Sequence, residues 1–184
     1  MIIFIIGAEK LLDEYLKWLY EILVKFEKEL GDNFTRLDEI IVAPFEDNNY
    51  KEAYHLYDKY IKKGYLFINS DSFKLDINEK IDNSMKCSFE CTIIHEIGHH
   101  LYEIHNLENK VIQFFNTNNN VKYIEEYLEY DKYKHRFDDE DRKSEFFAHY
   151  FCKVYRGELE STYRGVGNKI YDFILWEYNL LKRR

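Results

Sequence analysis

Hydrophobic positions recur at intervals of three and four from about Ala8 to Leu30. They are Leu11, Leu12, Tyr15, Leu16, Leu19, Ile22, Leu23 and Phe26. This spacing gathers apolar side chains on one face and predicts a helix packed against a core. Gly31 follows at the position where a helix commonly ends. The apolar residues 2–6 predict a short buried strand or the apolar start of this helix.

Residues 40–77 combine strand-like and helix-like patterns. Residues 40–43 form a mostly β-branched run that ends at a proline, and residues 65–69 and 73–77 indicate two strands around a polar turn. Residues 47–63 carry three tyrosines and an isoleucine at helical spacing, followed by Gly64, and predict a helix. We therefore expect three short strands before residue 82.

From residue 82 onward the pattern is helical. The candidate N-caps of the first helix, which runs to about residue 104, are Asp82, Asn83, Ser84 and Ser88. A helix from the acidic residues 138–141 to about Arg156 is apolar on most sides, which is typical of a buried helix. Further helices are predicted at 107–115, 121–133 and 168–182. The predicted fold class is α+β: a mostly helical single domain with a small sheet of three to four strands.

Composition and charge narrow the function classes. The chain has 184 residues, 46% of them hydrophobic, which suits one compact domain and argues against disorder. Its net charge of -8 argues against a wide nucleic-acid interface and mildly favours a basic partner. No apolar run approaches the roughly 20 residues of a membrane span, and no signal peptide is apparent. We expect a cytoplasmic protein, with secretion by a non-classical route left open.

The three cysteines are Cys87, Cys91 and Cys152. An odd number fits no disulfide framework well and favours a reducing compartment. Cys87 and Cys91 are four residues apart and share a helix face, but two further ligands for a metal there are not evident. We expect all three to be small buried thiols.

The sequence His95-Glu96-Ile97-Gly98-His99 has the HExxH pattern. Two histidines four apart on a helix face the same way and can bind one metal ion. Glu96 lies about 100° round the helix from His95, where its carboxylate can take a proton from a metal-activated water. These residue types therefore predict a zinc site, with one Zn²⁺ per chain, and Glu96 as general base.

A catalytic zinc site usually needs a third protein ligand. His105 has the spacing of the HExxHxxGxxH enzymes, but Tyr102 stands where their glycine belongs, and no methionine follows the motif. Glu145, on the predicted buried helix, is the stronger candidate, because a buried carboxylate needs a metal or charged partner. His149 lies one turn further along the same face, whereas His100 points away from the motif.

The HExxH motif, followed 46 residues after His99 by Ser144-Glu145-Phe146-Phe147-Ala148, resembles the catalytic domain of anthrax lethal factor and the related Pro-Pro endopeptidases. The resemblance covers roughly residues 36–155 and includes the order of helices and small sheet. It implies a zincin-like fold in which His95, His99 and Glu145 bind zinc and Glu96 is the general base. We accordingly divide the single domain into an N-terminal helical extension (1–35), a catalytic core (36–155) and a C-terminal helix (156–184).

Two positions depart from that family. Its oxyanion-stabilising tyrosine, seven residues before the ligand glutamate, is replaced by Asp138, and Tyr133, Tyr130 and His135 remain alternatives. His149 stands where the family has a second glutamate, and the role of this histidine stays open.

The predicted function is that of a zinc metalloendopeptidase. Its partner is a protein or peptide substrate that lies extended along a sheet edge, at residues 65–69 or 73–77, and neither nucleic acid nor membrane is expected as a partner. One alternative is an inactive zincin-fold metal-binding or interaction module. A second is a zinc-dependent repressor-cleaving protease, although no helix-turn-helix is apparent.

Overall fold

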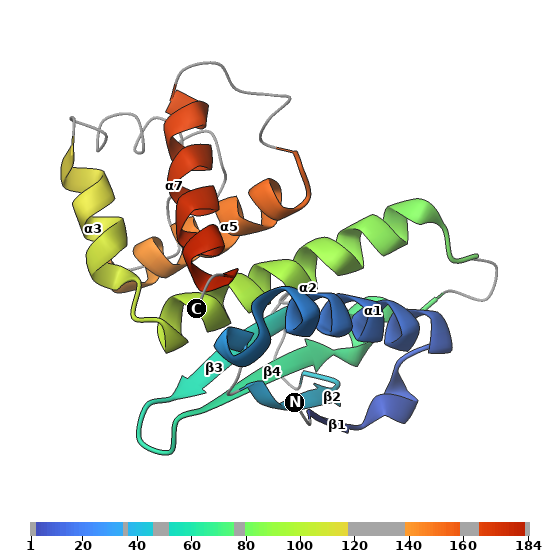
Figure 1. The fold of residues 1–184 in the computed structure, drawn as a ribbon. Helices are drawn as coiled ribbons and strands as arrows, with labels where there is room; N and C mark the ends of the chain where they lie inside the picture. Colours follow the sequence, from blue (N-terminus) through green and yellow to red (C-terminus); the bar gives the residue numbers. More distant parts are fainter. Residues whose placement is uncertain are drawn as a thin grey trace.

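The computed structural model describes residues 3–34, 37–45, 52–75, 80–117, 139–158 and 166–182. In these residues the chain forms a four-stranded mixed sheet and five α-helices, which confirms the predicted α+β class (Figure 1). The strands are β1 (Phe4–Ile6), β2 (Leu37–Ala43), β3 (Ala53–Asp58) and β4 (Lys63–Asn69). The helices are α1 (Asp13–Leu30), α2 (Asn83–Ile104), α3 (Glu108–Asn116), α5 (Asp139–Tyr155) and α7 (Val166–Lys182).

The strands lie in the order β1-β2-β4-β3. β1, β2 and β4 are parallel, whereas β3 pairs with β4 in an antiparallel hairpin. The hairpin turn is held by the Asp58 carboxylate, which accepts hydrogen bonds from the backbone N–H groups of Tyr60 and Ile61 at 2.8 and 3.1 Å. β1 thus confirms a strand in this segment, but the prediction that it is buried is wrong, because Phe4 and Ile6 are 64% and 52% exposed on this edge strand.

The helix predicted over 47–63 is wrong in its described part, because β3 occupies Ala53–Asp58 and Gly64 lies inside β4. Residues 46–51 lie outside the described residues. Tyr54 stacks on Phe67 of β4 with the ring centroids 4.5 Å apart, so the aromatic residues serve a cross-strand pair. Tyrosines spaced for a helix also occur readily in strands, and here their pairing with residues of β4 favours the strand over the helix.

The strand predicted over 73–77 is also wrong for its described residues. A 3₁₀-helix spans Ser70–Phe73, and the Asn69 side chain accepts a hydrogen bond from the Asp71 backbone N–H at 3.1 Å. The short polar residues therefore form a turn that buries the Phe73 ring. β4 lies between β2 and β3, so residues 65–69 are not an open sheet edge; β1 and β3 are the edge strands.

Helix α2 begins and ends as the sequence predicted. The Asp82 carboxylate accepts hydrogen bonds from the backbone N–H groups of Ser84 and Met85, at 2.9 and 3.0 Å. This N-cap satisfies donors that have no partner within the helix. The other predicted helices are found as α1, α3, α5 and α7, whereas the helix predicted at 121–133 lies outside the described residues.

Helix α2 is the central element of the fold. In Figure 1 it runs between the sheet and α1 on one side and α3, α5 and α7 on the other. Its residues Phe89, Ile93, Ile97 and Leu101 are at most 1% exposed. Among the described residues no helix is long and apolar enough to cross a membrane. The arrangement places α2 directly against α5, the helix that contains Glu145.

Gly98 allows α2 and α5 to approach closely. A Cβ atom at Gly98 would lie 2.7 Å from the Ala148 Cα atom, which is closer than van der Waals contact permits. A glycine facing an alanine therefore brings the two helix backbones together. Short side chains on the two helices can meet as a result.

Candidate metal centre

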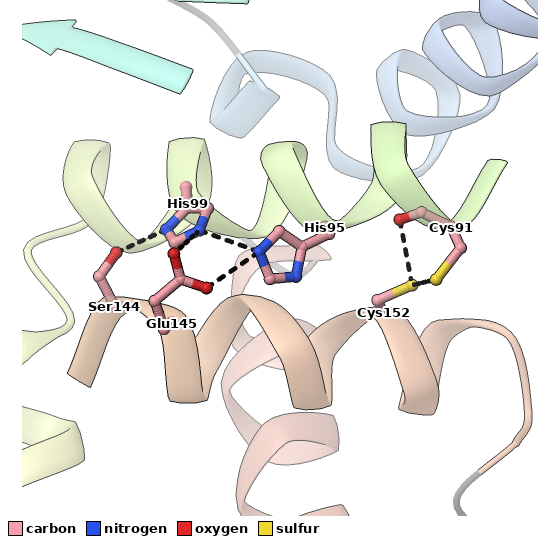
Figure 2. Close-up of polar contacts among 6 residues, drawn as sticks. All are labelled: Cys91, His95, His99, Ser144, Glu145 and Cys152. Atoms are coloured by element: carbon pink, nitrogen blue, oxygen red, sulfur yellow. Dashed lines mark hydrogen bonds and ion pairs between the residues drawn. The ribbon is translucent and has the colours of Figure 1, made fainter. Parts of the chain in front are cut away.

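Three side chains from α2 and α5 meet at one point, shown in Figure 2. The Nε2 atoms of His95 and His99 lie 3.1 Å apart. Glu145 Oε2 lies 3.2 Å from His95 Nε2, and Glu145 Oε1 lies 3.4 Å from His99 Nε2. The side chains are 24%, 14% and 28% exposed, so the cluster is sheltered but reachable from solvent.

This geometry fits a metal ion. The three ligand atoms all lie within 4.8 Å of one another, and the shortest separations are 3.1–3.4 Å. Ligands about 2 Å from a tetrahedral zinc ion lie about 3.3 Å from each other. Two imidazole nitrogens and a carboxylate are also common zinc donors. The cluster is therefore a possible His–His–Glu metal site, made of the three residues that the sequence singled out.

Ser144 holds the His99 ring in place. The His99 Nδ1 atom lies 2.7 Å from the Ser144 hydroxyl oxygen. When Nδ1–H donates to this hydroxyl, the lone pair of Nε2 is left for a metal, and the ring cannot rotate freely. This role was not predicted from the sequence, although the position of Ser144 directly before Glu145 was the available signal.

His95 and Glu145 shift each other's protonation. Burial disfavours the charged form of His95, but the hydrogen bond to Glu145 and the charge of Glu96 outweigh it and raise the pKa of His95. For Glu145, burial is likewise outweighed by hydrogen bonds from His95 and His99, which lower the pKa of Glu145 far below its usual range. The carboxylate is therefore ionised at neutral pH and can act as a ligand.

Glu96 lies beside the cluster but is not part of it. Its side chain is buried, with 8% exposure, and burial raises the pKa of its carboxyl group. A backbone hydrogen bond from His55 on β3 and the charges of His99 and His95 oppose this rise. The raised pKa makes the Glu96 carboxylate a stronger base than an ordinary glutamate, which suits a proton acceptor.

The other histidines considered as ligands have different roles in the structure. His105 Nε2 lies 2.9 Å from the backbone oxygen of Asn33, and His105 follows the last residue of α2. His149 packs its ring edge-on against Tyr150, at 5.1 Å between centroids. Within the described part of the chain, neither belongs to the group of close ligand atoms.

His100 forms a second histidine pair on the face of α2 that lies against the sheet. It is fully buried, and its Nδ1 atom lies 3.1 Å from His55 Nε2 on β3. Burial, followed by the charges of His100 and His99, lowers the pKa of His55 to about 2. The sequence placed His100 away from the motif but did not find His55, because residues 47–63 were predicted to be helical.

The residues considered for stabilising the oxyanion lie outside the described residues: Tyr130, Tyr133, His135 and Asp138.

Two surface hollows, with volumes of about 540 and 390 Å³, are lined by other parts of the chain, mainly α3 and α7 for the first and α1 and α2 for the second. Neither hollow is lined by the His–His–Glu cluster, so the cluster is identified by its ligand geometry and not by a cavity.

Comparisons with known proteins found no match for this chain. The chain matches no protein-family model, no curated protein and no solved structure. The geometry of His95, His99 and Glu145 is therefore the observation on which the function is argued: a possible three-residue metal site on two packed helices.

Proposed function

We propose that the protein is a zinc-dependent endopeptidase of the HExxH…E class. The observation that carries this proposal is the convergence of His95, His99 and Glu145 to mutual distances of 3.1–3.4 Å. The two histidines come from one helix, whereas the glutamate comes from a helix that begins far along the chain. Side chains so distant in sequence gain this arrangement only through the packing of α2 on α5.

The residues around the site have distinct roles in this proposal. Zinc, when bound by the three ligands, supplies the Lewis acidity that lowers the pKa of water and polarises a carbonyl group. Glu96 accepts the proton of the attacking water and passes it to the leaving amine. The Ser144 hydroxyl keeps the His99 ring oriented, and the ionised Glu145 balances the charge of the metal.

The proposed substrate is a peptide that extends along β3. This strand is the edge of the sheet on the side of α2, and its His55 backbone already bonds to Glu96. An edge strand leaves backbone groups able to pair with an extended peptide. Leu56, which is 52% exposed on β3, is placed to contact substrate side chains. The net charge of -8 favours basic peptides.

The experiment that tests the metal site is elemental analysis of the purified protein and a Glu145→Ala variant. We expect about one zinc per wild-type chain and a sharp reduction in the variant. Glu90→Ala is the matched control, because Glu90 is a half-buried carboxylate of α2 that pairs with Lys86 instead of the cluster. Undiminished zinc in Glu145→Ala would contradict the ligand assignment.

A Glu96→Gln variant tests the activity separately. It should keep its zinc and lose nearly all cleavage of a peptide library that the wild type cleaves, because glutamine cannot accept the proton. Zinc binding by the wild type without cleavage of any peptide would instead favour the alternative, a zincin-fold module that binds metal or a partner and has no turnover.

A further inference from the structure

Two cysteines on the helices of the candidate metal centre lie in contact (Figure 2). The Sγ atoms of Cys91 and Cys152 are 3.3 Å apart, and Cys152 Sγ lies 3.4 Å from the Cys91 backbone oxygen. Cys152 is 2% exposed, whereas Cys91 is half-buried and so remains partly accessible from solvent. The two residues are 61 positions apart in the chain, so only the folded structure brings them together.

The close packing of α2 on α5 explains this contact. Gly98 and Ala148 bring the two backbones together, as described above, and the cysteines lie further along the same pair of helices. Cys91 precedes His95 by one turn, and Cys152 follows Glu145 by about two turns. The thiol pair and the His–His–Glu cluster therefore bridge the same two helices at different points.

We propose that Cys91 and Cys152 are a redox-active pair that forms a reversible disulfide between α2 and α5. This inference goes beyond the proposed peptidase activity and does not depend on it. The sulfur atoms have only to move from 3.3 Å to about 2.05 Å, a shift that side-chain rotation and a small helix adjustment can supply. Cys87 is exposed and contacts Arg156, so it is not the natural partner of either thiol.

Cys91 is the thiol that reacts first. It is the more accessible of the two, and the hydrogen bond from Cys152, together with the Arg156 guanidinium, lowers the pKa of Cys91, whereas the pKa of Cys152 is raised. The Cys91 thiolate attacks hydrogen peroxide, the O–O bond breaks, and a sulfenic acid forms while the departing hydroxide takes up the proton that the Cys91 thiol released, which gives one water. The Cys152 sulfur then attacks the Cys91 sulfur, the S–O bond breaks, and a second water leaves with the Cys152 proton. Two thiols are oxidised to one disulfide, and the peroxide is reduced to two waters.

The disulfide would tether the helix of Glu145 to the helix of the two histidines. A cross-link between residues far apart in the chain restricts the unfolded ensemble strongly, so it stabilises the folded form. In the oxidised protein α5 stays docked on α2 without help from a metal. Reduction by a small thiol returns the pair to its contact in the structure.

The test begins with the full-length, reduced, metal-free protein treated with a small excess of hydrogen peroxide. We expect the loss of two free thiols and of two hydrogen atoms in mass, with a Cys91–Cys152 cross-link in the peptide map that dithiothreitol reverses. Cys87→Ser is the matched control and should form the same bond, whereas Cys152→Ser should form no internal bond. A cross-link that contains Cys87, or retention of both thiols in the folded wild type under excess peroxide, would overturn the proposal.

Thermal unfolding tests the tether with the same wild-type chain in both states. The midpoint of the oxidised form should lie roughly 5–15 °C above that of the reduced form, because the closed loop is long. Peroxide-treated Cys152→Ser should show no such rise, which controls for oxidation elsewhere. Equal midpoints for the two wild-type states would show that the bond does not hold α5 on α2.

Discussion

His99 and His100 are neighbours in the chain and lie in opposite environments. His99 faces α5, where Ser144 and Glu145 contact its ring and 14% of its side chain is exposed. His100 is fully buried on the face of α2 against the sheet and pairs with His55 on β3. Successive residues lie about 100° apart round a helix, so one step along the chain separates a candidate ligand from a core residue.

The difference between these two faces is electrostatic. On the α5 face Glu145 hydrogen-bonds to His95, and this bond, together with the charge of the adjacent Glu96, raises the pKa of His95 despite its burial. On the sheet face His55 meets burial and other imidazoles, and its pKa falls to about 2. Both histidines are largely buried, so a nearby carboxylate, more than burial, distinguishes a candidate metal ligand from a neutral histidine of the core.

The largest effect is expected when His99 and His100 are replaced by alanine one at a time. His99→Ala should lower zinc affinity by more than about 100-fold, because loss of a ligand exceeds the roughly 10–100-fold cost of losing a ligand's hydrogen-bond partner. His100→Ala should keep zinc affinity within a few-fold and lower the free energy of unfolding instead. Competition with a chromophoric chelator measures the affinities. Similar losses in two variants that both remain folded would mean that the faces are not distinct.

The contact between α2 and α5 can be broken at Gly98. Gly98→Ala places a Cβ atom 2.7 Å from the Ala148 backbone, an overlap that costs up to about 3 kcal/mol, whereas alanine gains about 1 kcal/mol in helix propensity. The overlap is the larger effect, so the free energy of unfolding should fall by about 2 kcal/mol. Urea denaturation measures it. Ser88→Ala, at an exposed site on the same helix, is the control and should not destabilise; a Gly98→Ala protein as stable as wild type would refute the close approach.

The Ser144→Ala variant tests whether the Ser144 hydroxyl orients the His99 ring. The variant removes the hydroxyl that lies 2.7 Å from His99 Nδ1 and leaves the three ligand atoms in place. Zinc affinity should fall by roughly 10-fold, at the lower end of the range for such partners, because the hydroxyl is neutral. Ser144→Thr keeps a hydroxyl and should recover most of the affinity in the same chelator competition. Full affinity in the alanine variant would show that Ser144 does not orient the ring.

We expect His55, on the sheet side of α2, to have a smaller, pH-dependent effect on the free energy of unfolding. The folded-state pKa of His55 is about 2, well below the usual 6.5, so the unfolded chain takes up a proton first as pH falls. The stability from neutral His55 is complete above about pH 6.5 and is lost below it, by about 1 kcal/mol between pH 7 and 5.5. The raised pKa of His95 acts with the opposite sign, because its contribution is present at low pH and is lost as pH rises.

The difference between wild type and His55→Gln isolates this effect, since His95 titrates in both proteins. Unfolding free energies from urea curves at pH 7 and 5.5 give the two slopes. The wild type should lose about 1 kcal/mol more than the variant over this range. Parallel slopes would mean that the His55 imidazole is not held neutral in the fold.

Local signals in the sequence were sufficient for α2 and for singling out the residues of the His–His–Glu cluster. Asp82 caps the helix, the HExxH spacing places His95 and His99 on one face, and Glu145 was found from its place in an apolar helix. That Glu145 lies close to the two histidines was predicted from the resemblance to known peptidases. These features depend on residues close in the chain or on one recognisable pair of motifs.

Features set by distant partners were predicted poorly. The strand at Ala53–Asp58 has no β-branched residue, and its pairing with β4 outweighed the helical spacing of its tyrosines. Cys87 was expected to be buried but is exposed at its place on α2. The contact of Cys91 with Cys152 could not be inferred either, because it depends on how closely α5 packs on α2.

The placement of the cluster on α2 and α5 also sets an order of events during folding. The two histidines share one turn of α2, so they face the same way as soon as that helix forms. Glu145 joins them only after α5 has docked, which requires closure of a long chain segment and is slow compared with helix formation. High-affinity zinc uptake would therefore follow the docking of α5, and a chain still emerging from the ribosome could not acquire it until α5 had left the exit tunnel.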